Sequence, residues 1–179
     1  AHAFMWKCPR HVDTDGQVCL VLPSKVFLNR TDAFQLKWFK HHRVDEVLQL
    51  ADLRFILFEN AVCPAIVVRY GIADVTATNY SFNYICPQAS RNDPRRGVVE
   101  ITSSDIRRIS SNAVSHFAER QMAPSLWKMN LRGSPRDLRF LDRMLSYPAL
   151  NELVGEPRQS NRWISSQGFQ PDDKGKTLD

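Results

Sequence analysis

The 179-residue sequence predicts an α/β fold: part of a doubly wound sheet, followed by a mixed α+β extension. The first observation is the order strand, helix, strand, strand between residues 17 and 70, which is typical of α/β architecture. The second is a first strand that is apolar throughout, as in strands buried on both faces. The third is that no Gly-rich phosphate-binding or dinucleotide-binding motif occurs in the sequence. We therefore expect the sheet to lack its N-terminal, cofactor-binding half.

Each element of this unit follows from a local pattern. The apolar run 18–22 predicts a buried strand, and apolar residues at helical spacing predict a helix over 31–42. Two further apolar stretches, 44–50 and 65–70, predict strands. The connection between them is long enough for a loop but poor for a crossover helix. We therefore expect the three strands to be neighbours, with the last one running antiparallel.

The extension that follows mixes strands and helices. Residues 80–86 alternate between apolar and polar, as in a strand buried on one face, and 98–101 predicts a short strand. Two prolines make 87–97 a loop. Several N-capping residues in 102–105 predict a helix that begins near Ile106.

The clearest helix start is at Ser134, an N-capping residue followed by Pro135 in the first turn and by Asp137 near the positive end of the helix dipole. Leucines then recur at helical spacing until Pro148. These breaks divide the chain into an α/β domain over 1–86, a basic α+β extension over 87–154 and a polar tail over 155–179.

The charge of the chain is unevenly placed. The sequence has 24 Lys and Arg residues against 19 Asp and Glu, a formal net charge of +5. Residues 91–143 contain eleven basic and six acidic residues and so account for the whole excess. A basic excess favours polyanionic partners through counterion release, although many surface helices are equally basic.

Other compositional features indicate a cytoplasmic protein. No apolar run of about 18 residues occurs, so no membrane contact is expected. The four cysteines form no Cys-x-x-Cys pair, which argues against a zinc site. Three of them lie in or beside apolar strands, and we expect reduced, buried thiols.

One stretch of the sequence is similar to a known family. The run Gln17–Leu28, QVCLVLPSKVFL, resembles the strand and turn that follow the catalytic motif of N6-adenine DNA methyltransferases. This N-6 DNA methylase family includes the TaqI-like and Eco57I-like modification enzymes. The similarity also includes residues 4–12, 47–50, 57–59 and 63–70, and it thins to weak similarity through about residue 147.

The resemblance implies a Rossmann-like methyltransferase fold, of which residues 1–86 would form the C-terminal half of the catalytic domain. The intact enzyme would transfer a methyl group from S-adenosylmethionine to adenine N6 at a specific DNA site, as in restriction-modification or phage defence. In the family, the element that matches Leu57 and Phe58 forms part of the target-base pocket. The resemblance therefore implies that Phe58 lies against a flipped adenine. The competing interpretation is that Phe55 and Phe58 pack in the core.

The chain departs from the family in its catalytic parts. The tetrapeptide Asn/Asp-Pro-Pro-Tyr/Phe is missing: residues 92–95 have one proline, lack the aromatic residue and follow the third strand. The Gly-containing loop that holds S-adenosylmethionine is missing as well. We therefore expect no cofactor on this chain alone, an inactive isolated polypeptide, and a separate N-terminal half or other subunits as partners.

Arginines are the candidates for contacts with DNA phosphates. The alternative is a solvated surface with local ion pairs, for instance to Asp137 and Asp142 on the last helix. The candidate residues are Arg91, Arg95 and Arg96 in the loop and Arg136, Arg139 and Arg143 on the helix.

Two further patterns allow both a functional and a structural interpretation. Tyr80, Phe82 and Tyr84 share one face of a strand and could stack on bases, although packing against a helix is commoner. His41 and His42 have no third metal ligand nearby, and a solvated helix end explains them better. For the whole chain, the alternative function is a non-catalytic DNA-binding or assembly module. A third possibility is an unrelated α/β domain with an accidental resemblance.

Overall fold

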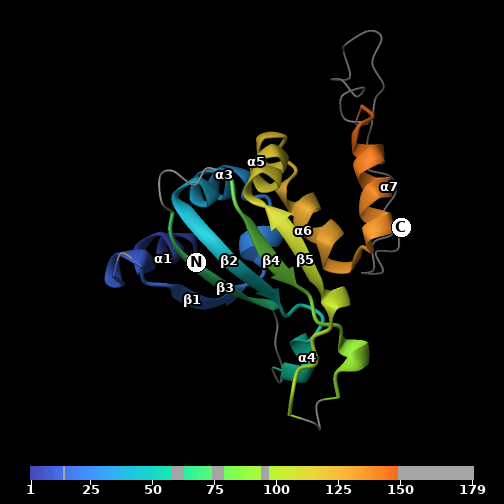
Figure 1. Cartoon of the computed structure of the whole chain (residues 1–179), viewed down its shortest axis with the longest axis horizontal. Coiled ribbons are helices and arrows are strands. Elements are labelled where there is room, and N and C mark those ends of the chain that lie inside the picture. Colours follow the sequence, from blue (N-terminus) through green and yellow to red (C-terminus); the bar gives the residue numbers. More distant parts are fainter. Residues whose placement is uncertain (14, 58–62, 74–78, 94–96, 149–179) are drawn as a thin grey trace, which may run out of the picture. The chain divides into compact units, whose positions relative to one another are not determined.

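The structure of the protein, a computed structural model, describes residues 1–13, 15–57, 63–73, 79–93 and 97–148 (Figure 1). These fall into two compact units, Ala1–Leu138 and Arg139–Asp179. The first unit is a mixed α/β structure, which confirms the α/β part of the predicted class, whereas the doubly wound arrangement stays a prediction. Its elements are α1 (His2–Lys7), η1 (Cys8–His11), β1 (Val18–Pro23), α2 (Lys25–Leu28), α3 (Asp32–His41), β2 (His42–Gln49), α4 (Arg54–Leu57), β3 (Ala65–Ile72), β4 (Ser81–Ile85), η2 (Ala89–Arg91), η4 (Ser103–Asp105), β5 (Ile106–Ser110), α5 (Ser111–Glu119) and α6 (Ala123–Arg132); α7 (Pro135–Leu145) begins in it.

The five strands of the described residues form one mixed sheet in the order β1-β3-β2-β4-β5. β3 lies between β1 and β2 and is antiparallel to both, so the predicted antiparallel strand is confirmed. β4 is parallel to β2, and β5 is antiparallel to β4. β1, β2 and β4 therefore point in the same direction, and their carboxyl ends lie at the same edge of the sheet.

Buried aromatic side chains of the strands and of α2, α3 and α6 belong to one hydrophobic core on one face of the sheet. Trp127 of α6 stacks on Phe27 with a centroid distance of 4.6 Å and meets Tyr84 of β4 edge-on at 5.3 Å. The indole Nε1 of Trp127 donates to Oε1 of the buried Gln35 at 2.7 Å, which satisfies both buried polar groups. This layer of rings fixes α2, α3 and α6 against the strands.

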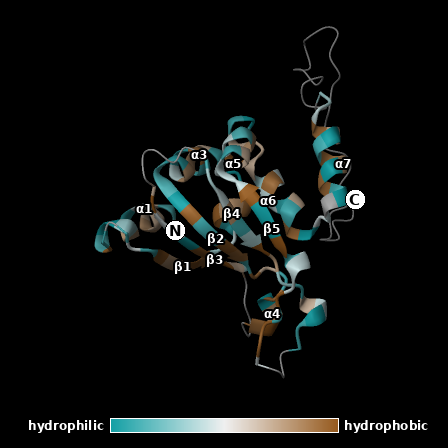
Figure 2. Ribbon diagram, in the orientation of Figure 1, coloured by the Kyte–Doolittle hydropathy of each residue, from teal (hydrophilic) through white to brown (hydrophobic). Residues whose placement is uncertain are grey.

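The other face of the sheet carries an apolar row that crosses all five strands. Val21 lies opposite Val67, which lies opposite Leu48, followed by Ile85 and Ile106. Val21 is 66% exposed and Ile106 41% exposed, whereas Ile85 is buried. Figure 2 shows hydrophilic and hydrophobic segments alternating along β2, as in a strand whose two faces differ. The described residues thus cover one face of the sheet with helices and leave much of the other open.

The expectation that residues 18–22 are buried on both faces is wrong for this structure. β1 is an edge strand that pairs only with β3, and its outward side chains Cys19 and Val21 are exposed. Successive side chains of a strand point to opposite faces of the sheet, so Cys19 and Val21 are exposed because the described helices cover only the other face. Among the described residues, none adds a second strand beside β1.

Two predictions within the extension are also wrong. Residues 98–101 form no strand, and 106–110 form β5 instead of the start of a helix. Of the predicted N-capping residues, Thr102 forms a capping box with Asp105, but it caps only the short 3-10 helix η4. The helix begins later, at α5, where the hydroxyl of Ser110 accepts a hydrogen bond from the Ala113 amide at 3.1 Å.

The predicted helix after Ser134 is confirmed as α7. The Asp137 amide donates to the Ser134 hydroxyl at 3.2 Å, and the Ser134 amide donates to the Asp137 carboxylate at 2.9 Å. This reciprocal pair is a capping box. Of its leucines, Leu138 and Leu141 are half-buried, and Met144 on the same helix is 53% exposed.

The cysteine prediction is partly right. Cys86 is buried and Cys8 half-buried, but Cys19 and Cys63 are exposed, and all four are free thiols. No helix in the described part of the chain is both long and apolar enough to span a membrane.

Candidate nucleic-acid interface

The strands β1, β2 and β4 all finish at the same end of the sheet. We call this end the carboxyl edge, as distinct from the two outer strands β1 and β5, which are the edge strands. Ser24 follows β1, Gln49 ends β2 and Cys86 follows β4. In open α/β sheets, ligands bind outside the carboxyl ends of parallel strands. The connections that leave this edge carry Phe58 and the loop arginines that the sequence singles out.

A buried hydrogen-bond network orders the connection after β2. Oε1 of Gln49 accepts from the Ser24 hydroxyl at 2.7 Å and from the Ala51 amide at 3.1 Å. Its amide nitrogen donates to the Tyr84 hydroxyl at 3.3 Å. Burial raises the pKa of Tyr84 well above its usual value, so this phenol stays protonated. Gln49 and Tyr84 thus position the backbone of this edge.

Asp52 joins three segments of the carboxyl edge. Its carboxylate accepts from the Ala89 amide at 2.8 Å and lies 3.5 Å from the guanidinium of Arg132 in α6. A hollow of about 340 Å³ lies beside it, lined by Ala51, Asp52, Cys86, Pro87, Gln88, Leu131 and Arg132. Burial raises the pKa of the Cys86 thiol to about 12, so it is no thiolate nucleophile near neutral pH. The polar groups of the hollow are thus the Asp52 carboxylate, the Arg132 guanidinium and amide groups. Such groups are better suited to binding a ligand than to covalent catalysis.

The loop arginine Arg91 is held by a buried carboxylate. Arg91 forms an ion pair with Asp105, whose side chain is fully buried, and also donates to Gln88. Burial alone would raise the pKa of Asp105, but hydrogen bonds from Arg91 and Thr102 outweigh it and lower that pKa. The pair ties the segment after β4 to the start of β5. Arg91 is therefore a structural residue of this edge, and its contact with DNA stays a prediction.

The remaining predicted site residues lie in different places. Arg136 is exposed on α7. Arg139 and Arg143 are exposed on the same helix, within the second unit. Phe58, Arg95 and Arg96 lie outside the described residues.

The aromatic face of β4 is not available for base stacking. Phe82 and Tyr84 are 2% and 0% exposed, and both face the helical layer. Tyr80 donates its hydroxyl to the backbone oxygen of His42 at 2.7 Å, and burial raises its pKa to about 12. The structural interpretation of these rings is the right one.

His42 is buried, so a solvated helix end does not describe it. The residue is 4% exposed, and its ring stacks on Trp38 at 5.1 Å and meets Trp6 and Tyr70 edge-on. Burial lowers its pKa, while the hydrogen bond between its Nδ1 and the Trp38 carbonyl acts in the opposite sense. It is a core histidine at the start of β2.

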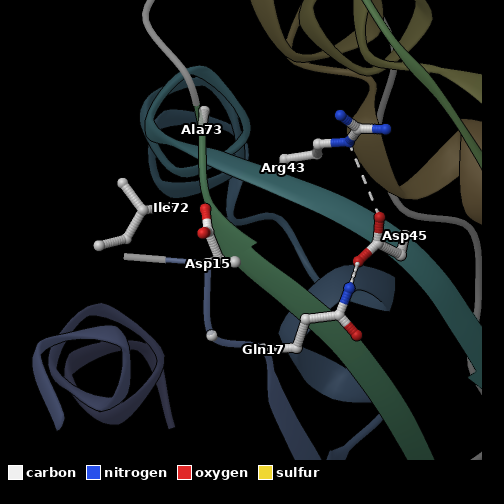
Figure 3. A pocket seen from close by; sticks show the side chains of 8 residues that line it. Asp15, Gln17, Arg43, Asp45, Ile72 and Ala73 are labelled. Carbon is white, nitrogen blue, oxygen red and sulfur yellow. Dashed lines mark hydrogen bonds and ion pairs between the residues drawn. The ribbon is translucent and has the colours of Figure 1, made fainter. Parts of the chain in front are cut away.

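A second hollow, of about 650 Å³, lies at the opposite edge of the sheet (Figure 3). There the side-chain amide nitrogen of Gln17 donates to the Asp45 carboxylate at 2.9 Å, and its side-chain oxygen accepts from the Arg69 guanidinium at 3.2 Å. The guanidinium of Arg43 lies 3.8 Å from the same carboxylate. Every charged group in this chain of contacts has a partner, and Arg43 is 61% exposed. The arrangement is a solvated surface network at the amino ends of β1 and β2.

Sequence comparisons give no relative on which to base a role for these residues. The chain matches no protein-family model, and no curated protein is similar to it in sequence.

Proposed function

We propose that this chain is the C-terminal part of the catalytic sheet of a site-specific adenine-N6 DNA methyltransferase. In this proposal it contributes a wall of the target-base pocket and a DNA-facing surface. The observation that carries the proposal is the position of β3, antiparallel between the parallel strands β1 and β2. Three of the stretches that resemble the methyltransferase family, 17–28, 47–50 and 63–70, include residues of these three strands.

The convergence at the carboxyl edge supports the DNA-facing part of the proposal. The connection that contains Phe58 leaves β2 at the edge where the segment that contains Arg91, Arg95 and Arg96 leaves β4. Asp52 links the two segments by its hydrogen bond from Ala89. A base pocket flanked by cations is the arrangement that an enzyme acting on DNA needs, because phosphate contacts supply most of the affinity.

The described residues do not fit S-adenosylmethionine. In the described residues no Gly-rich turn follows a strand: the turn after β1 is Pro23-Ser24, with Ser24 fully buried and bonded to Gln49. In the proposal, the cofactor and the catalytic tetrapeptide come from a separate N-terminal half. Isothermal titration of the isolated chain with S-adenosylmethionine should give no micromolar binding, and labelled methyl transfer to DNA should be absent.

The decisive experiment restores the missing half. The reading frame upstream of this segment, if it encodes a Gly-rich loop and an Asn-Pro-Pro-Tyr-like motif, should be co-expressed with it. The complex should transfer a labelled methyl group from S-adenosylmethionine to adenine in duplex DNA. A complex that forms but transfers no methyl group would contradict the proposed methyltransferase activity.

The DNA-facing surface can be tested on the chain alone. We expect weak, sequence-indifferent binding to a fluorescent duplex, with log Kd strongly dependent on log salt. Replacing Arg136, Arg139 and Arg143 by Ala should reduce the salt slope by about one unit for each phosphate contact made. The control replaces three exposed arginines elsewhere, Arg10, Arg30 and Arg43, with the same change in net charge. Equal slopes for the two triple variants would assign the α7 arginines to a solvated face.

A non-catalytic DNA-binding or assembly module is the second candidate, and the open edge of β1 favours it. That edge is free of charged side chains from Val18 to Pro23 and can accept a strand of another polypeptide. Methyl transfer by the reconstituted complex would decide against this alternative. DNA binding without any methyl transfer would favour it.

A further inference from the structure

An exposed aromatic residue lies on α4, where the sequence suggested core packing as one interpretation. Phe55 is 75% exposed, the largest value among the exposed aromatic residues of the described chain. The guanidinium carbon of Arg54 lies 4.0 Å from the centre of its ring. A phenyl ring left in water forgoes the free energy that its burial would contribute. A ring presented in this way is suited to a ligand that covers it.

The orientation of Phe55 is fixed by the residues around it. Leu53, two positions earlier, is fully buried and anchors the turn in the core. The Ile56 and Leu57 amides both donate to the Leu53 carbonyl at 2.9 Å, and the Leu53 amide donates to Leu50 at 3.1 Å. With Leu53 directed inward, the side chain of Phe55 points to solvent.

The charges around α4 favour a polyanion. Asp52 precedes α4 and brings the guanidinium of Arg132 to within 3.5 Å of its carboxylate, and the side chain of Arg132 is 80% exposed. The same carboxylate holds the Ala89 amide, two residues from Arg91. Arg54 on α4 adds a second cation, whereas the guanidinium of Arg91 is already paired with Asp105. Figure 1 places α4 at the end of the sheet where these segments leave the strands.

We propose that Arg54 and Phe55 form a stacking platform for an unpaired nucleobase of a DNA strand. Arg54 covers one face of the ring through a cation–π contact and leaves the remainder of the ring open. Aromatic rings beside cationic grooves hold single-stranded DNA in this way, because every base has a π-face and the cations contact the phosphates. The platform rests on the proposed DNA-facing role of the carboxyl edge, and it is separate from the role that the resemblance implies for Phe58.

The test measures fluorescence anisotropy with a labelled 12-nucleotide oligodeoxyadenylate and with an abasic sugar-phosphate oligomer of equal length. Stacking is worth about 1–3 kcal/mol per base, so Phe55→Ala should weaken oligodeoxyadenylate binding by roughly 5- to 150-fold. Phe55→Leu, which keeps an apolar side chain without a ring, should lose nearly as much. Phe55→Trp should bind at least as tightly as the wild type. All variants should leave binding of the abasic oligomer unchanged.

The matched control is Phe140→Ala, which removes a phenyl ring that is 62% exposed on α7. It should leave oligodeoxyadenylate affinity within twofold of the wild type. Circular dichroism and urea unfolding confirm that each variant is folded. Wild-type affinity in Phe55→Ala and Phe55→Leu would overturn the platform while leaving the proposed function intact. Equal losses on both oligomers would also overturn it. A wild type that binds neither oligomer nor duplex would refute the DNA-facing role itself.

Discussion

Replacing Asp105 by Asn should lower the free energy of unfolding more than the same replacement at any exposed Asp, because Asp105 fixes the segment after β4. One oxygen of its buried carboxylate pairs with Arg91. The other accepts from the amide and the hydroxyl of Thr102 at 2.9 and 3.1 Å. An Asn amide has one acceptor oxygen, so its NH₂ group must face either the guanidinium or the Thr102 amide.

The expected loss follows from burial. Removing one partner of a buried ion pair costs about 3–5 kcal/mol, since the other charge stays uncompensated. The Arg91 side chain is 29% exposed, so water compensates part of that charge. We therefore expect the free energy of unfolding to fall by about 2–3 kcal/mol at pH 7.

Urea unfolding followed by circular dichroism measures this change as a lower midpoint at constant slope. The control is Asp137→Asn, an exposed carboxylate that also accepts hydrogen bonds from Ser134.

The folded-state pKa of Asp105 is lowered, so its stabilisation is present above its unfolded pKa of about 3.9 and is lost as pH falls through the folded pKa. The difference between wild type and Asp105→Asn should therefore shrink in strong acid. Equal midpoint shifts for the two variants at pH 7 would refute the reasoning.

Two further predictions concern the core. The lowered folded-state pKa of His42 means that the unfolded chain binds protons more readily below about pH 6.5, so stability should fall as pH drops from 7 toward 5. His42→Gln should flatten that dependence in urea unfolding, whereas replacement of the exposed His116 by Gln should not. Trp127→Ala should cost about 3–5 kcal/mol, because it empties the space between α6 and the sheet and leaves the Gln35 carbonyl without its donor. The control is Trp6→Ala, which removes a half-buried ring. If Trp127→Ala lowers the urea midpoint no more than this control does, Trp127 does not make the large contribution to core stability that we expect.

Local patterns predicted the elements that depend on local physics. The length of the connection after Leu50 was enough to predict the antiparallel β3, and Ser134 and Asp137 were enough to locate α7. Non-local pairing decided the rest. Residues 98–101 and 106–110 are both short and contain branched apolar side chains, but only the second pairs with β4.

The candidate site was harder to predict than the fold. The sequence places Phe58 and the loop arginines on separate connections, and it is the parallel β2 and β4 that bring those connections to one edge. Phe55 was assigned to the core as one alternative because it is apolar, and its exposure follows from the inward anchor of Leu53. Several neighbouring residues of this turn are apolar, and its backbone directs only some of them into the core. A helix this short gives too little periodicity to predict which ones.

The uncharged edge of β1 has a practical consequence for work with this protein. The opposite edge strand, β5, carries Arg107 and Arg108, charges of the kind that keep sheet edges apart. β1 has no such protection, and its exposed Val21 ends the apolar row across the sheet. At high concentration, β1 of one molecule is a template for β1 of the next, so we expect the isolated chain to self-associate and finally to aggregate. Light scattering should detect this as concentration-dependent growth that Val21→Lys suppresses. That variant, with its edge protected, is the form in which DNA affinities of the isolated chain can be measured on monomers.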